Sequence, residues 1–233
     1  DGQAVVIYNT LAWSRDGIVK ISLEKLPENP AVINPSGKII PSQIIELSND
    51  KQQLIFIARD IPSLGYATYR VVSKPGAAAP QTNLSCNGTT LENSFLKVEL
   101  DPKSGDIKSI FDKVNNNEII KSQQGGNVLQ LYEDKPKDYD AWNIGIGAEK
   151  YLDRLGDVEL VEAGPVRYTL KSEKRVGDGV STFDRYITLY NDWPMVDGLI
   201  RANWQERNVI AKLAFNLNMM NETAWFEIPY AAI

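Results

Sequence analysis

The sequence predicts an all-β protein, with a small β-sandwich followed by a large antiparallel double-sheet sandwich. Apolar and polar residues alternate with a period of two over most of the chain, and β-branched residues are frequent in these stretches. Turn residues separate the stretches at intervals of a few to a dozen positions. The apolar fraction of 43% is ordinary for a globular protein, so a sizeable core can form. No stretch shows helical periodicity over a convincing length.

The first predicted domain covers residues 1–73. It opens with a strand at 5–8, and Asp16-Gly17 is expected to turn the chain into a strand at 18–21. Three further strands are expected, at 39–46, 54–58 and 67–72. About six short strands are enough for a small β-sandwich.

Residues 74–89 are predicted to form a linker. The run from Lys74 to Pro80 contains proline, glycine and alanine, with no large apolar residue and no periodicity. We therefore expect the domain boundary here, with the large sandwich at 90–233.

The large sandwich is predicted to open with a hairpin. Two alternating segments, 95–100 and 107–111, flank the turn residues 101–106. Residues 163–165 and 177–179 are expected to form the turns of two more hairpins. Further strands are expected at 127–132, 158–163, 166–174, 182–190, 196–203, 210–216 and 224–228.

The composition excludes several classes of function. The chain has no histidine and one cysteine, Cys86, so the usual zinc sites and the Ser-His and Cys-His nucleophile pairs cannot form. We therefore expect no catalytic residue, metal site or cofactor in this chain.

The net charge of −5 without a basic patch argues against a nucleic-acid partner. No apolar run reaches the ~18 residues of a membrane span. A single thiol is typical of a reducing compartment, which predicts a cytoplasmic location.

The segment 132–145 is the densest polar and aromatic stretch. Carboxylates accept hydrogen bonds from sugar hydroxyls and aromatic rings stack on apolar sugar faces, so this mixture is typical of a carbohydrate contact. The alternative is a solvated acidic loop that Trp142 pins to the edge of the sandwich. Paired carboxylates could also cleave glycosides or hold calcium, although the spacing is not specific for either. The residues concerned are Glu133, Asp134, Asp138, Tyr139, Asp140 and Trp142.

Trp204-Gln205-Glu206-Arg207 is a second polar and aromatic cluster, and we expect a structural ion pair there at the rim of the sandwich. The other tryptophans, Trp13, Trp193 and Trp225, are expected in the core or as anchors between domains.

Seven segments of the chain carry a resemblance to a known family, and they are 8–15, 61–66, 91–98, 105–113, 139–142, 203–207 and 227–230. Together they resemble glycoside hydrolase family 38, the class II α-mannosidases, in the order in which that family has them. The Asp140-Ala141-Trp142 form is most similar to the cytosolic and bacterial branch.

The resemblance implies a larger retaining enzyme, of which this chain is the middle-to-late part. An upstream α/β domain would bind zinc and supply an aspartate nucleophile, and the large sandwich would be a galactose-mutarotase-like supersandwich that is incomplete at its C-terminus. This chain would support that catalytic domain, its partner, and line part of the pocket for an α-mannoside or oligosaccharide. Trp142 would be the aromatic contact, with Asp140 and Tyr139 beside it.

Two other readings remain open at this point. The chain could be an independent carbohydrate-binding sandwich with Trp142 as its platform. It could also be a structural or adhesion-type sandwich without a ligand.

Overall fold

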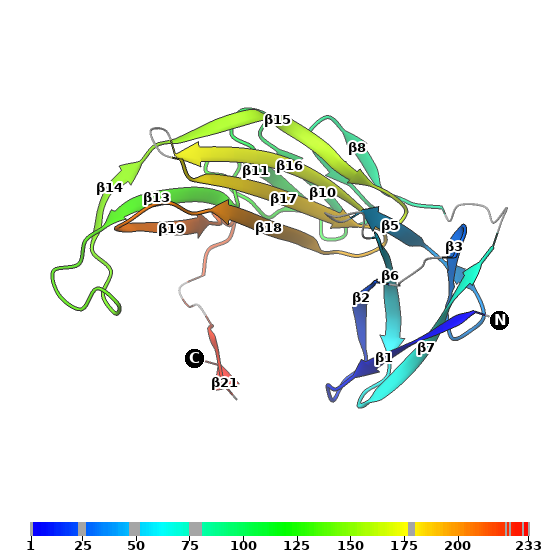
Figure 1. Cartoon of the computed structure of the whole chain (residues 1–233). Coiled ribbons are helices and arrows are strands. Elements are labelled where there is room, and N and C mark those ends of the chain that lie inside the picture. The colour runs from blue at the N-terminus through cyan, green and yellow to red at the C-terminus, as the bar shows by residue number, and fades with distance from the viewer. Residues whose placement is uncertain are drawn as a thin grey trace. The chain divides into compact units, whose positions relative to one another are not determined.

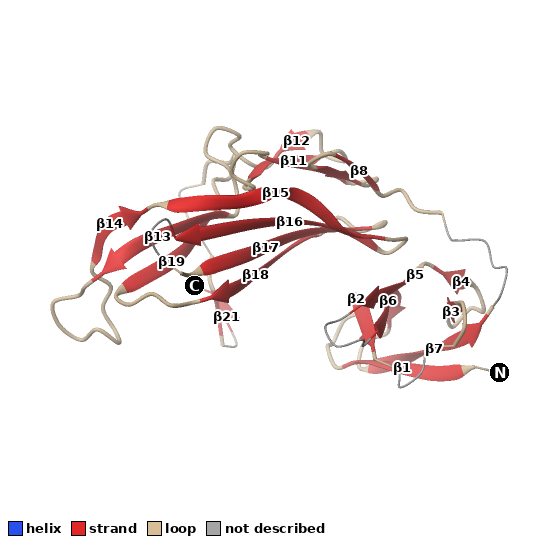
Figure 2. Cartoon of the chain, turned by 45° about the horizontal axis from the view of Figure 1, so that its top comes forward, coloured by secondary structure: helices blue, strands red, loops and turns tan. Residues whose placement is uncertain are grey.

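A computed structural model describes most of the 233 residues, and all regular structure in the described part is β-strand (Figures 1 and 2). None of its elements is a helix long and apolar enough to cross a membrane. The all-β sandwich class predicted from the sequence is thus confirmed. The described residues are 2–22, 27–46, 52–74, 81–176, 180–221, 223, 225–229 and 231–232.

The chain divides into two compact units. Each unit collects segments that are distant in sequence. The first unit comprises Asp1–Phe95, Val158–Lys171 and Arg185–Leu199. The second comprises Leu96–Asp157, Ser172–Asp184 and Ile200–Ile233. The predicted boundaries at 73 and 90 remain predictions, and residues 75–80 of the predicted linker lie outside the described residues.

The first unit contains a small sandwich, called here the first sandwich. One of its sheets has the order β1-β7-β3-β4, and the other has the order β2-β6-β5. The strands are β1 (Gln3–Asn9), β2 (Arg15–Ile21), β3 (Pro30–Ile33), β4 (Ile39–Ile40), β5 (Ser42–Glu46), β6 (Gln52–Ile61) and β7 (Gly65–Ser73).

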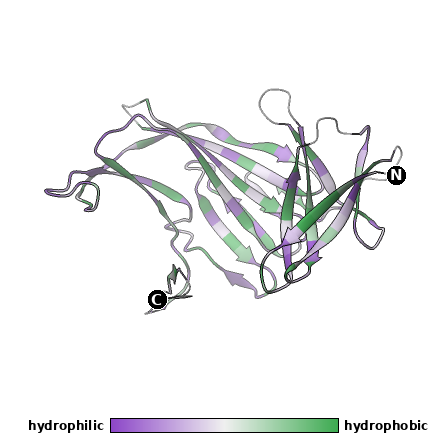
Figure 3. Cartoon of the chain, turned by 60° about the horizontal axis from the view of Figure 1, so that its bottom comes forward, coloured by the Kyte–Doolittle hydropathy of each residue, from purple (hydrophilic) through white to green (hydrophobic). Residues whose placement is uncertain are grey.

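The core of the first sandwich is built by side chains that alternate along its strands with a period of two residues. Along β7, Ala67, Tyr69 and Val71 are buried while their neighbours are less so, because successive side chains point to opposite faces. Phe56 of β6 packs against Tyr69 with 5.1 Å between ring centroids. Figure 3 shows the corresponding alternation of hydrophobic and hydrophilic residues along the strands.

Two predictions for this sandwich were wrong in detail. Asp16-Gly17 is not a turn but lies within β2, at a β-bulge opposite β6; the chain turns earlier, in the bend at 11–13. The single strand predicted at 39–46 is two strands in different sheets, β4 and β5. Pro41 separates them, because proline has no backbone N–H to donate to a continuing ladder.

The remaining strands form sheets in the orders β12-β11-β10-β9-β8, β14-β13-β19, β15-β16-β17-β18 and β20-β21. Their bounds are β8 (Ser85–Asn87), β9 (Thr90–Glu92), β10 (Leu96–Leu100), β11 (Ile107–Asp112), β12 (Asn117–Glu118), β13 (Val128–Asp134), β14 (Ile146–Lys150), β15 (Leu152–Ala163), β16 (Arg167–Val176), β17 (Thr182–Tyr190), β18 (Val196–Asn203), β19 (Val209–Ala214), β20 (Glu227–Ile228) and β21 (Ala231–Ala232).

The predicted hairpin at 101–106 is confirmed. β10 and β11 pair antiparallel, and Asp101 Oδ1 accepts the backbone N–H groups of Lys103 and Ser104, each at 2.8 Å. Gly105 takes a positive φ of 69°, which glycine adopts without strain. β15 and β16 are neighbours across residues 164–166, as predicted. The turn predicted at 177–179 lies outside the described residues, and β14 was not predicted.

The second unit has its own apolar core beneath β13. Leu129, Leu131, Val176 and Phe183 are buried together there. Because Leu129 and Leu131 point to the same face of β13, the strand is fixed to the core through its first half.

Candidate functional site

The polar and aromatic segment singled out in the sequence forms a loop at residues 135–145, called here the 135–145 loop. It joins β13 to β14, which pair antiparallel from Leu131 opposite Lys150 to Asp134 opposite Ile146. Figure 1 shows the loop at the free end of this ribbon. The strand predicted before the loop ends at Tyr132, whereas β13 continues to Asp134.

The base of the loop is fixed by three hydrogen bonds. Asp134 Oδ1 accepts the Gly145 N–H at 2.7 Å, and the Lys135 N–H donates to the Gly145 carbonyl at 3.0 Å. The Asp134 N–H also donates to the Asn208 carbonyl at 2.7 Å. A Cβ on Gly145 would lie 2.5 Å from the Pro136 nitrogen, so the two ends of the loop meet where only glycine fits.

The tip of the loop is a compact turn around Tyr139. The backbone N–H groups of Trp142 and Asn143 both donate to the Tyr139 carbonyl at 2.8 Å. Asn143 Nδ2 donates to the Asp138 carbonyl at 2.8 Å, and Tyr139 itself has a positive φ of 56°. Its left-handed backbone and these bonds give the tip a defined conformation.

The aromatic side chains at this tip are exposed. Trp142 has 88% of its surface accessible and Tyr139 has 76%. Trp142 therefore does not pin the loop to the sandwich, so that part of the alternative predicted from the sequence is wrong, whereas a solvated acidic loop agrees with the structure. Asp138 and Asp140 are also exposed. The structure brings Tyr139, Asp140 and Trp142 together in one turn, and their role in binding a substrate stays a prediction.

The other carboxylates of the segment have structural positions. Asp134 closes the loop, and Glu133 lies 3.7 Å from Lys135 Nζ in an exposed ion pair. Among the residues that the structure describes, no three His, Cys, Asp or Glu side chains lie close enough to hold a metal ion.

The second cluster predicted from the sequence forms a polar network near the end of β14. Lys150 Nζ lies 3.5 Å from Glu206 Oε2, while Ser181 Oγ donates to Glu206 Oε1 at 3.1 Å and accepts the Gln205 N–H at 2.9 Å. The Glu206 side chain is only 13% exposed. An ion pair was expected here, but its cation is Lys150 rather than the adjacent, exposed Arg207.

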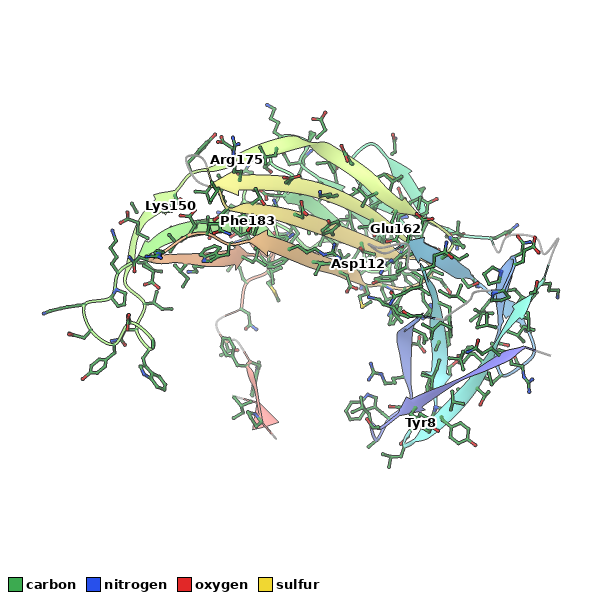
Figure 4. All side chains as sticks on the ribbon, viewed as in Figure 1. Tyr8, Asp112, Lys150, Glu162, Arg175 and Phe183 are labelled. Carbon is green, nitrogen blue, oxygen red and sulfur yellow. The ribbon has the colours of Figure 1, made fainter. Side chains whose placement is uncertain are left out.

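An aromatic contact lies beside this network. The rings of Phe183 and Trp204 meet edge to face, with 6.0 Å between centroids. Lys150 and Phe183 are labelled in Figure 4. Lys150 and Ser181 were not predicted as residues of this site. They lie 56 and 25 positions from Glu206 in the sequence, so no local pattern of residues indicates the contacts.

The remaining tryptophans differ in their surroundings. Trp13 and Trp225 are exposed, so neither is a core residue. The Trp193 ring lies under the Arg59 guanidinium at 5.3 Å and packs against Tyr190, within the first unit. Burial, together with a hydrogen bond from its hydroxyl to Asp197 at 2.6 Å, raises the pKa of Tyr190 above its ordinary value.

The fold and the loop define an all-β sandwich protein with a fixed turn of exposed aromatic and acidic side chains. A family model described as "Glycosyl hydrolases family 38 C-terminal domain" matches residues 91–233, more than half of the chain. The chain therefore belongs to glycosyl hydrolase family 38, as its C-terminal region.

Two curated relatives agree with this family. The lysosomal alpha-mannosidase of Bos taurus is 32% identical over 102 residues, which cover 43% of this chain and 10% of that protein. Alpha-mannosidase 2C1 of Homo sapiens is 24% identical over 237 residues, which cover 98% of this chain and 20% of that protein. The chain thus spans a tenth to a fifth of the length of these relatives.

Proposed function

We propose that this chain is a non-catalytic β-sandwich region of a retaining α-mannosidase, and that it supports the catalytic domain and lines part of the sugar pocket. The observation that carries the proposal is the exposed, fixed tip of the 135–145 loop in a chain of family 38. The alpha-mannosidase names of the relatives support the substrate class, terminal α-mannosides.

The proposed contact uses the chemistry of the loop tip. An indole ring with both faces accessible can stack on the apolar face of a pyranose, and a neighbouring carboxylate can accept hydrogen bonds from its hydroxyls. Trp142 and Asp140 would take these roles, with Tyr139 beside them. Because the loop is already closed at Gly145, little ordering would be needed when the sugar binds.

The proposal assigns the bond cleavage to another part of the polypeptide. No catalytic residue and no metal site are proposed for this chain. The metal and the nucleophile would belong to an upstream catalytic domain, the proposed partner of this region. A cytoplasmic location is proposed from the single cysteine and from the form of the Asp140-Ala141-Trp142 segment.

An independent carbohydrate-binding module is the second candidate function. The exposure of Trp142 favours it, because such a platform could bind a sugar without a catalytic domain. In that case the 233-residue chain alone should bind an α-mannoside with saturation, and Trp142→Ala should abolish the binding.

The main experiment is Trp142→Ala in the full-length enzyme that contains this region. We expect kcat/KM for an α-mannoside to fall about tenfold or more, since a removed contact to the bound sugar costs on the order of 1.4 kcal/mol. Trp225→Ala is a matched control, because Trp225 is also largely exposed but lies outside the loop. An unchanged kcat/KM in the Trp142 variant would contradict the proposal.

A further inference from the structure

A cavity of about 440 Å³ opens at one end of the first sandwich. This volume is within the range of small-molecule sites. Its lining comes from the β3–β4 turn, the end of β6 and the start of β7. The polar and aromatic members of the lining include Asn34, Ser36, Arg59, Asp60, Tyr66 and Thr68.

The polar groups of this cavity have free hydrogen-bonding capacity. The Asp60 N–H donates to Asp16 Oδ1 at 2.9 Å, but its carboxylate has no hydrogen bond or ion pair to any residue in the described ranges. Asn34 Oδ1 accepts from Ser36 Oγ and from the Lys38 N–H, while its Nδ2 has no partner among those same residues. One acceptor and one donor are therefore available to a ligand.

One exposed aromatic ring, that of Tyr66, belongs to the same lining as the polar groups. Tyr66 of β7 is 62% exposed and pairs across the sheet with Tyr8 of β1, with 5.8 Å between the tilted rings. Trp13 is 61% exposed in the neighbouring bend, and Tyr8 is labelled in Figure 4. An exposed cross-strand aromatic pair offers ring faces that no residue of the sandwich core covers.

The segments that carry these rings are held by a buried asparagine. Asn9 is 4% exposed, and its Nδ2 donates to the carbonyls of Trp13, Ile61 and Pro62 at 2.7, 3.1 and 3.0 Å. Its Oδ1 accepts the Leu11 N–H at 3.0 Å. One side chain thus fixes the bend at 11–13 to the end of β6, and the rings are displayed from a rigid base.

We propose that this end of the first sandwich binds a neutral hexopyranose unit of a glycan, with the Tyr66 ring as the platform and the Asp60 carboxylate and Asn34 amide as partners for its hydroxyls. A ring face beside an acceptor and a donor matches a sugar, which has an apolar C–H face and a hydroxyl edge. The core of a protein–protein interface would instead be depleted of charged residues such as Asp60 and Arg59.

This site is separate from the proposed pocket-lining role. No residue of the 135–145 loop contributes to it, and the two groups of residues lie in different compact units. Loss of either proposal therefore leaves the other in place.

The test is a titration of the isotope-labelled 233-residue chain with α-mannotriose, maltotriose and cellotriose, followed by NMR. We expect saturable shifts at residues 34–36 and 59–69 with at least one of the three. Tyr66→Ala should weaken binding about tenfold, because it removes the stacked ring. Asp60→Asn should weaken binding about threefold or more, because it removes a charged acceptor. Asparagine also tolerates the positive φ of 52° at position 60, so the second variant preserves the fold.

Tyr151→Ala is the control, since its side chain is exposed elsewhere in the chain and has no proposed role in binding. It should leave the affinity at this site unchanged. Failure of all three sugars to bind would overturn the proposal, as would binding that survives both Tyr66→Ala and Asp60→Asn. Binding abolished by Trp142→Ala alone would also overturn it and would support the independent module described above.

Discussion

Gln43 Nε2 donates a 2.7 Å hydrogen bond to Glu162 Oε1, which joins β5 to the turn end of the β15–β16 hairpin, and both residues belong to the first unit. Gln43 Oε1 accepts the backbone N–H groups of Val166 and Arg167, at 3.1 and 3.0 Å. Arg167 Nε in turn lies 2.8 Å from Glu162 Oε1. Gln43 is buried, so its amide is the centre of a satisfied polar network.

We expect Gln43→Ala to lower the free energy of unfolding by about 1–3 kcal/mol. The substitution leaves two backbone N–H groups and one carboxylate oxygen with fewer partners in a buried place. Urea unfolding measures the change. Gln53→Ala removes an exposed hydrogen bond to Ser22 Oγ and is the control, with an expected change within about 0.5 kcal/mol. Equal losses in both variants would contradict the role of the network.

Gly164→Ala should also destabilise the first unit, by about 1–3 kcal/mol. A Cβ at Gly164 would overlap the side-chain amide of Gln43, which its hydrogen bonds hold in place. In the double variant with Gln43→Ala the overlap is gone, so the two losses should be clearly less than additive. A double-mutant cycle of unfolding free energies provides the measurement, and strict additivity would show that the two residues do not interact.

Gly145→Ala should open the base of the 135–145 loop. The new methyl group would collide with the backbone of Lys135 and Pro136, so the hydrogen bonds that close the loop would lengthen or break. We expect faster cleavage between residues 135 and 145 in limited proteolysis. Gly17→Ala is the control, because nothing lies within 4 Å of the corresponding Cβ. Identical cleavage rates for the two variants would mean that Gly145 does not hold the loop.

The Asp101 turn should make stability depend on pH on the acid side. Hydrogen bonds from the backbone N–H groups of Ser104 and Lys103 lower the pKa of Asp101 and outweigh the opposing effect of burial. Its stabilising effect is present above the unfolded pKa of about 3.9 and is lost as pH falls through the lower folded value. We expect the Tm difference between wild type and Asp101→Asn to shrink as pH is lowered from about 6 to about 3.

Asp138→Asn is the control for this pH series. Asp138 is exposed, and only its backbone carbonyl accepts a hydrogen bond in the described part of the chain. Its Tm profile should follow that of wild type. A Tm difference for Asp101→Asn that is constant across the pH range would contradict the assignment of the stabilisation to the charged carboxylate.

The sequence predicted strands best where alternation was long and the turn chemistry was strong. The strands at 182–190 and 196–203 have the predicted bounds, and the hairpin around Asp101 was identified from its turn residues. Pro41 and the Asp16-Gly17 bulge were misread. In both places the same residues are compatible with two local structures, and the strand that pairs with the segment determines which one forms.

The candidate site could be predicted in part. Residue types marked the 135–145 loop, but only the structure shows that Trp142 is exposed and that Asp134 closes the loop. The Lys150 partner of Glu206 could not be identified, because their contact depends on how β14 and the segment after β18 are arranged in space. The cavity beside Tyr66 was missed for the same reason, since three separate segments line it.

The place of β1 in its sheet bears on the order of events during synthesis. β1 lies at the edge of the sheet and pairs only with β7 among the described strands, with Gln3 opposite Val71 and Asn9 opposite Gly65. β1 is synthesised before β7, so this strand has no β7 partner until residues 65–71 emerge from the ribosome. The nascent chain therefore carries β1 as an unpaired strand while most of the first sandwich is synthesised. Chaperone binding would have its greatest effect during this interval.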